Sequence, residues 1–159
     1  MGKYMFLTIS VLVFIALTSV SYHHDSDVQF ECTAHNYKEF PDFRGDWLIL
    51  REITTLTFFK NSLRAVVKGK AYIKGEGHYL DRVATYNMHR EQQGTYRLTL
   101  VKMNKLSRDS LMDDDDVTPY ILGLSPGESR TFRFRWLNDS TLLIGSQTQY
   151  QTACTHYPI

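Results

Sequence analysis

The stretch that decides the fold spans residues 63–74 and reads LRAVVKGKAYIK. Its odd positions are small or apolar: Leu63, Ala65, Val67, Gly69, Ala71 and Ile73. Most of its even positions are cationic: Arg64, Lys68, Lys70 and Lys74. Because successive side chains of a strand point to opposite faces, this alternation predicts a strand with one face in a core and the other in solvent.

The same alternation recurs downstream, at residues 96–101 and 131–136. Residues 46–60 differ because both of their faces are partly apolar, which indicates a strand buried on two sides or a bulge near Thr54 and Thr55. The predicted inward residues, which would line either a packed core or a ligand cavity, are Leu63, Val67, Ile73, Tyr96, Leu98, Leu100, Phe132, Phe134 and Trp136.

Short turns separate these runs. Residues 60–62, 75–77, 92–94 and 138–140 contain the Gly, Asn, Asp and Ser residues that hairpin loops favour. Consecutive hairpins form an antiparallel meander, so we expect a mainly β fold that closes into a barrel or partial barrel. The predicted strands are residues 28–36, 46–60, 63–74, 78–90, 94–104, 130–137 and 140–152.

The segment from Ser107 to Leu124 lacks strand alternation and carries four consecutive aspartates, Asp113–Asp116. We expect one or two short helices that end before Pro119, and then an irregular loop. Calcium loops place their ligands at alternate positions and need a glycine, and this run has neither feature. The sequence therefore favours a solvated loop, and we predict no metal site.

The N-terminus carries the clearest targeting signal. After Lys3, the nineteen residues Tyr4–Tyr22 contain no charge, which is just enough apolar length to span a bilayer as a helix. We expect an uncleaved anchor at Tyr4–Val20 with Lys3 in the cytoplasm; the alternative is a cleaved signal peptide. The predicted organisation is an anchor or signal peptide at 1–22, a linker at 23–27 and an exported β domain at 28–159.

The two cysteines, Cys32 and Cys154, lie near the two ends of the exported part. They have no standard zinc spacing, and an oxidising compartment favours a single disulfide between them. The bridge would bring the first and last strands of the domain within disulfide reach of each other.

The remaining patterns exclude several function classes. With 18 Lys and Arg against 17 Asp and Glu, the net charge of +1 lacks the basic excess typical of direct nucleic-acid binding. The chain has no HExxH pair, no GxSxG elbow and no Gly-rich phosphate loop, so we predict no catalytic residues and no cofactor. A barrel with an apolar, aromatic interior leaves binding of a small apolar ligand as one expectation and a plain core as the other.

The layout resembles the FidL-like family of small enterobacterial membrane proteins. The residues that carry the resemblance are the short basic N-terminus with its apolar segment, Cys32, the Leu124-Ser125-Pro126-Gly127 segment and Cys154. Family members look like accessory partners of ToxR-type regulators, which join a cytoplasmic DNA-binding domain to a periplasmic sensor domain. The resemblance implies a lipocalin-like barrel that in some cases binds bile salts, with Cys32 and Cys154 as its end-to-end bridge.

From the residues and the resemblance together we expect a non-enzymatic, single-pass protein of the bacterial inner membrane with its C-terminal domain in the periplasm. It would stabilise or modulate a ToxR-type regulator in signal transduction, and it would sense a small apolar ligand. The alternative is a soluble exported carrier of such a ligand after signal cleavage.

Overall fold

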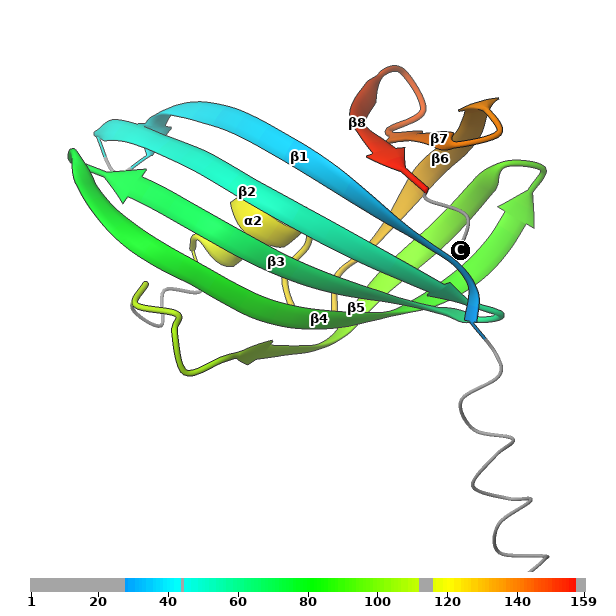
Figure 1. Cartoon of the computed structure of the whole chain (residues 1–159), viewed down its shortest axis with the longest axis horizontal. Helices are drawn as coiled ribbons and strands as arrows, with labels where there is room; N and C mark the ends of the chain where they lie inside the picture. The colour runs from blue at the N-terminus through cyan, green and yellow to red at the C-terminus, as the bar shows by residue number, and fades with distance from the viewer. Residues whose placement is uncertain (1–27, 44, 112–115, 157–159) are drawn as a thin grey trace, which may run out of the picture.

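The structure, a computed structural model, describes residues 28–43, 45–111 and 116–156. This part of the chain forms eight antiparallel strands and one short helix (Figure 1). The elements are β1 (Val28–Phe43), β2 (Asp46–Phe59), β3 (Ser62–Ile73), β4 (Glu76–Gln92), β5 (Thr95–Lys105), α2 (Thr118–Leu122), β6 (Ser129–Asn138), β7 (Thr141–Gly145) and β8 (Tyr150–Thr155). The predicted anchor at Tyr4–Val20 and the linker at 23–27 lie outside the described residues. No helix among the described residues has the length and apolar character needed to span a membrane.

Each strand pairs with the next in the sequence, and β1 returns to β8, so the sheet closes into a barrel. This confirms the predicted antiparallel meander and agrees with a lipocalin-like barrel. The closing seam is the shortest, because the ladder between β1 and β8 contains only the pair Thr33 and Thr155. The disulfide between Cys32 and Cys154 crosses the same seam with its Cα atoms 5.4 Å apart, as predicted.

The strand count differs from the prediction of seven, because residues 140–152 hold a chain reversal between β7 and β8. The turn is made by Ser146, whose backbone N–H donates to the carbonyl of Gln149 (2.9 Å). The Ser146 hydroxyl also accepts from the N–H groups of Thr148 and Gln149, both at 3.3 Å. Serine hydroxyls can close such turns, but residues 146–149 contain no Gly, Pro, Asn or Asp to mark one in the sequence.

Of the two alternatives for residues 46–60, the bulge near Thr54 and Thr55 is absent from the described strand. β2 keeps one register with β3 from Phe58 opposite Leu63 to Leu48 opposite Ile73. The even positions of β2 face the barrel interior: Leu48, Leu50, Glu52, Thr54, Leu56 and Phe58. The apolar alternation is interrupted because Glu52 and Thr54 are polar residues that face inward, not because the strand contains an extra residue.

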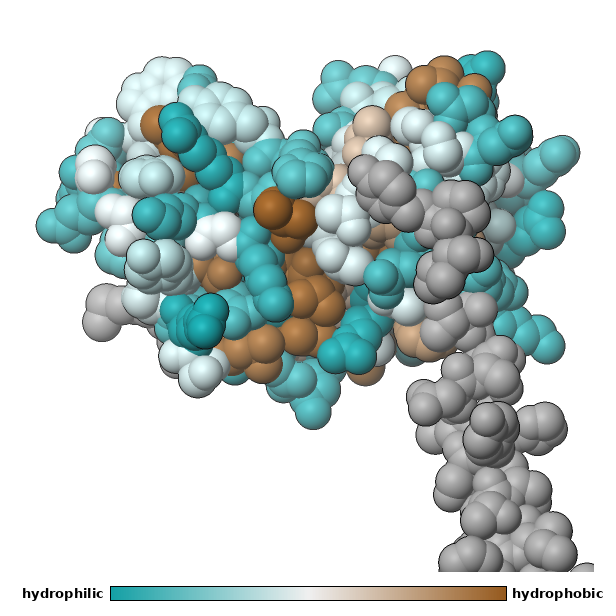
Figure 2. Space-filling view, in the orientation of Figure 1, coloured by the Kyte–Doolittle hydropathy of each residue, from teal (hydrophilic) through white to brown (hydrophobic). Residues whose placement is uncertain are grey.

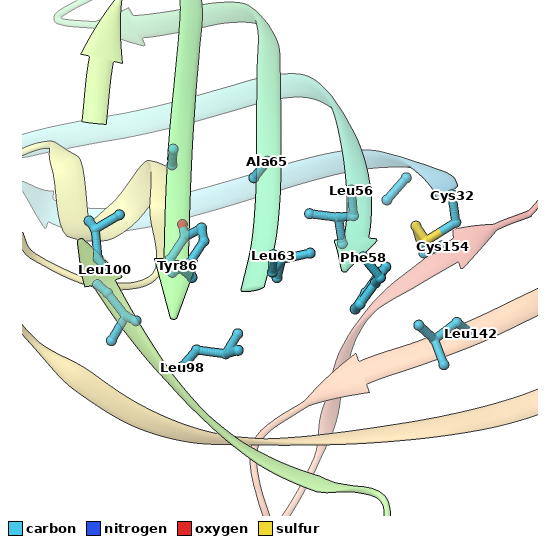
Figure 3. Packing of buried hydrophobic residues seen from close by; sticks show 13 residues of the cluster. Cys32, Leu56, Phe58, Leu63, Ala65, Tyr86, Leu98, Leu100, Leu142 and Cys154 are labelled. Carbon is cyan, nitrogen blue, oxygen red and sulfur yellow. A yellow bond between two sulfur atoms is a disulfide. The ribbon is translucent and has the colours of Figure 1, made fainter. Parts of the chain in front are cut away.

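Buried side chains form two clusters inside the barrel. The larger cluster lies beside the disulfide and draws on β1–β5, β7 and β8 (Figure 3). In this view Leu56, Phe58, Leu63 and Leu98 point into a common interior. The smaller cluster fills the other end of the long strands, where β2, β3 and β4 pack against α2, Leu111 and Val117. The barrel interior is therefore closed at that end by the segment between β5 and β6.

A buried ion pair holds this closing segment in place. Nε of Arg82, which faces inward from β4, lies 2.9 Å from Oδ2 of Asp109, and both side chains are almost completely buried. Asp109 also accepts from the backbone N–H of Asp81 (3.1 Å). The prediction that the helical segment ends before Pro119 is wrong, since α2 has this proline in its first turn. Proline suits a helix start, where its missing N–H would have had no helical partner.

The outer face of β2–β4 is not uniformly polar. Figure 2 shows hydrophobic residues in the middle of this face, with hydrophilic residues around them. Outward positions at mid-strand include Ile53, which is 45% exposed, and the half-buried Val66 and Val83. Val66 and Val83 lie directly opposite each other across β3 and β4.

Loss of the disulfide should destabilise the barrel strongly. Replacing Cys32 and Cys154 with serine should lower the free energy of unfolding by about 2–5 kcal/mol, the usual range for a native bridge. Without the disulfide, the described β1–β8 seam keeps a single ladder pair to hold the two strands together. Denaturant unfolding of the wild type and the double variant measures this difference. Equal unfolding midpoints would contradict the prediction.

Candidate ligand site inside the barrel

A cavity of about 140 Å³ lies between the two buried clusters. Its wall is mostly apolar, and the aromatic side comes from Phe132 and Phe134 of β6. Leu56, Leu63 and Leu98 supply aliphatic wall from β2, β3 and β5. The end of α2 and the Gly123 that follows it close one end. An enclosed apolar space with a few polar groups is the usual form of a small-molecule site.

The polar part of the wall is a compact group on β1 and β2. Nζ of Lys38 lies 2.6 Å from Oε1 of Glu52, which makes an ion pair inside the barrel. Nδ2 of Asn36 donates to the same oxygen at 3.4 Å and to Oγ1 of Thr54 at 3.3 Å. The hydroxyl of Thr152 on β8 donates to Oδ1 of Asn36 at 3.4 Å. All five side chains line the cavity.

The second carboxylate oxygen of Glu52 has no hydrogen-bond partner among the described residues, although it is buried. The Glu52 side chain is only 1% exposed, whereas that of Lys38 is 31% exposed. A buried carboxylate oxygen without a partner is costly, because it has lost water and gained nothing in return. Glu52 is therefore the one wall residue whose hydrogen-bonding capacity is both buried and unused.

Gly69 explains how a glutamate fits at this point. It lies directly opposite Glu52 on β3 and faces the same side of the sheet. A Cβ at Gly69 would lie 2.1 Å from the carbonyl oxygen of Arg51 and 2.7 Å from the Cα of Glu52. Only a residue without a side chain permits this close approach of β2 to β3.

Tyr86 of β4 places a second polar group in the wall, but its capacity is used. Its hydroxyl donates to the carbonyl of Leu122 at 3.0 Å, which ties the end of α2 to the barrel. Burial raises the pKa of Tyr86 above its ordinary value, and the negative charge of Glu52 raises it further. The phenol therefore stays neutral and remains a hydrogen-bond donor.

Residues on both sides of the β1–β8 seam belong to the cavity wall. Lining residues Asn36 and Lys38 of β1 face Gln151 and Thr152 of β8 across this seam. Beyond Thr33, β1 has no ladder pair with β8 among the described residues. Since the two strands are joined there by side chains alone, this part of the seam is the natural way in for a ligand.

The structure divides the nine predicted inward residues. Leu63, Val67, Leu98 and Leu100 are buried. The residues that line the cavity are Leu63, Val67, Leu98, Phe132 and Phe134. The ring of Tyr96 stacks on that of Phe134 with centroids 5.2 Å apart, and Ile73 packs against the cluster near α2.

Trp136 does not fit the prediction of a core or lumen residue. It is 47% exposed, although its ring lies 5.3 Å from that of Phe30. Trp136 takes the last inward position of β6 before the turn to β7, opposite Leu142, at the rim of the barrel. The β5–β6 ladder ends at Thr95 opposite Arg133, three residues before Trp136.

Sequence reasoning missed the polar group of the cavity. Two signals were available. The even positions of β2 read Leu-Leu-Glu-Thr-Leu-Phe from residue 48 to 58, which places Glu52 among core residues. Gly69 also interrupts the inward row of β3 at the position opposite Glu52.

Two hollows on the outer surface enclose more space, about 300 and 430 Å³. The first lies around Trp47, Arg51 and Tyr72, and the second around Asp81 and Arg108. The wall of the barrel cavity is more apolar than the wall of either hollow, so we prefer the barrel cavity as the site for an apolar ligand. Where the chain is described, no three His, Cys, Asp or Glu residues gather in a way that could hold a metal ion.

Comparison with models of known protein families gives no match, and comparison with curated proteins gives none. The resemblance to the FidL-like family therefore stays a prediction, and the function is argued from the cavity alone.

Substitutions of Phe134 and Trp136, which lie on the same face of β6, test the assigned geometry of the cavity wall. Phe134→Ala should cost about 2–3 kcal/mol, somewhat less than the 3–5 typical of a fully buried phenylalanine, since one side of the ring already borders empty space. Trp136→Ala, the matched control at the rim, should cost about 1 kcal/mol or less. Thermal and denaturant unfolding of both variants measure the difference. A Trp136→Ala variant that is less stable than Phe134→Ala would contradict the assigned geometry.

Proposed function

We propose that this chain is a non-catalytic binding protein that holds a small, mostly apolar molecule inside its barrel. The observation that carries the proposal is the largely apolar cavity of about 140 Å³ with Phe132 and Phe134 in its wall. An engineered apolar cavity of about 150 Å³ binds benzene, so a space of this size suffices for a ligand of six to eight heavy atoms.

The cavity size supports a smaller ligand than the bile salts that the family resemblance implies. Pockets for drug-sized molecules usually measure about 300–1,000 Å³. A steroid body would need the β1–β8 seam to separate, which the disulfide between Cys32 and Cys154 opposes. The disulfide itself supports an exported, oxidising location, whether the chain is an anchored sensor or a soluble carrier.

Benzene is the simplest probe of the cavity. Saturating benzene should raise the melting temperature of the full chain, because a ligand that binds only the folded state stabilises it by mass action. Ala65→Leu should abolish this rise, since Ala65 lines the cavity and the larger side chain occupies the ligand's space. Arg64→Leu is the matched control, because the same side chain then lies on the outer face. No rise in the wild type would contradict the proposal.

A second candidate is the accessory role beside a ToxR-type regulator. The observation that favours it is the edge of β1, which is visible along the upper side of Figure 1. Residues 34–42 of β1 have no ladder partner on the side away from β2 in the described structure. A free strand edge can pair with an extended segment of another protein.

Site-specific crosslinking in intact membranes tests the accessory role. A photo-reactive residue in place of Tyr37, which is 56% exposed on β1, should yield an adduct with a ToxR-type regulator. The control places the photo-reactive residue at Asp139, in the exposed turn after β6, where no adduct with the regulator should form. Absence of a regulator adduct at Tyr37 would remove this candidate.

A further inference from the structure

We propose that the ligand of this cavity carries a neutral hydrogen-bond donor, a hydroxyl group on a small apolar body, and that Oε2 of Glu52 accepts its hydrogen bond. The inference rests on the proposed function, since it names the chemical class of the ligand for the same cavity. It follows from how the two oxygens of one carboxylate are used.

The two oxygens of Glu52 are unequal. Oε1 receives hydrogen bonds from Lys38 at 2.6 Å and from Asn36 at 3.4 Å. Oε2 receives none from the described residues and has less than 1 Å² of accessible surface, so the carboxylate group has to rotate toward the cavity to meet a ligand donor. A carboxylate oxygen buried in this way binds any donor that reaches it more strongly than water would allow at the surface. The missing partner is therefore a donor that arrives with the ligand.

The charge of the site favours a neutral donor over a cation. Lys38 already balances Glu52, so the pair carries no net charge. An ammonium group in the cavity would add an unbalanced buried charge, which costs far more than the burial of a hydroxyl. An anionic ligand would face the unpartnered oxygen of Glu52 directly. A hydroxyl supplies the donor without either penalty.

The rest of the wall fixes the body of the ligand. Phe132, Phe134 and Leu98 face the cavity with apolar surface, and the space of about 140 Å³ holds one six-membered ring with a small substituent. The ligand class is therefore a simple phenol or a cyclic alcohol of the same size. A larger ring system would collide with the end of α2 and with Gly123, which close one end of the cavity.

Matched probes test the inference. Phenol, benzene and benzylamine differ in one group, and calorimetry on the full chain with its disulfide intact gives the Kd of each. Phenol should bind at least about tenfold more tightly than benzene, because hydrogen bonds to charged groups are the strong ones. Benzylamine should bind more weakly than phenol.

The role of Glu52 is tested by substitution. In Glu52→Leu the tighter binding of phenol than of benzene should disappear. Glu52→Gln keeps the shape of the side chain and serves if the leucine variant fails to fold. In Glu52→Gln the ratio of the two Kd values should fall to a few-fold. Glu76→Gln is the matched control, since Glu76 is exposed at the start of β4, and it should keep the full ratio. A phenol advantage that survives in both Glu52 variants would overturn the inference.

The outcomes separate the two proposals. Equal Kd values for phenol and benzene in the wild type would overturn the inference and leave the proposed function standing. If benzylamine binds most tightly of the three, the inference that the ligand's donor is neutral would be overturned in favour of a cationic donor. Failure of all three probes to bind would overturn the proposed function, and the inference would fall with it.

Discussion

The closure of the barrel depends on the covalent bond between Cys32 and Cys154. Neighbouring strands elsewhere are joined by ladders of several pairs, but among the described residues the β1–β8 ladder holds the single pair of Thr33 and Thr155. A single ladder pair does not hold two strands together, since a lone hairpin is already marginal in water. The bridge closes a loop with a sequence separation of 122 residues, where the chain-entropy model gives a disulfide its largest effect. The shape of the interior is therefore set by a bond at its closing seam.

This constraint also places the cavity and its opening. The disulfide holds the seam together near Thr33, and farther along β1 only the side chains of Asn36 and Thr152 join the strands. At the opposite end, Arg82 and Asp109 fasten the segment that carries α2 under the long strands. The space left between these two closures is lined from both sides and is reached beside Lys38. A rigid closure at each end with a weakly joined seam between them is an arrangement that admits a small molecule without unfolding the sheet.

How far the sequence predicts this structure depends on how local each feature is. The alternation of Leu63 to Ile73 and the hairpin turns report on single strands and their neighbours, so the meander and its inward rows follow from them. The disulfide followed from the number and location of the cysteines. The β7–β8 turn was missed because serine closes it without Gly, Pro, Asn or Asp, and Trp136 was misplaced because a period of two does not show where a barrel ends. The roles of Glu52 and Lys38 depend on pairing between strands and on burial, which residue types alone do not reveal.

The two charged pairs inside the barrel differ in what they explain. The pair of Arg82 and Asp109 joins β4 to a segment 27 residues farther along the chain, together with backbone hydrogen bonds from the same segment to β4, so it has a structural reason. The pair of Lys38 and Glu52 joins β1 to β2, which a continuous ladder from Phe30 to Phe40 already holds together. A buried ion pair seldom adds stability over apolar residues of the same volume. Neither strand pairing nor stability therefore accounts for Glu52, whereas an acceptor for a ligand hydroxyl does.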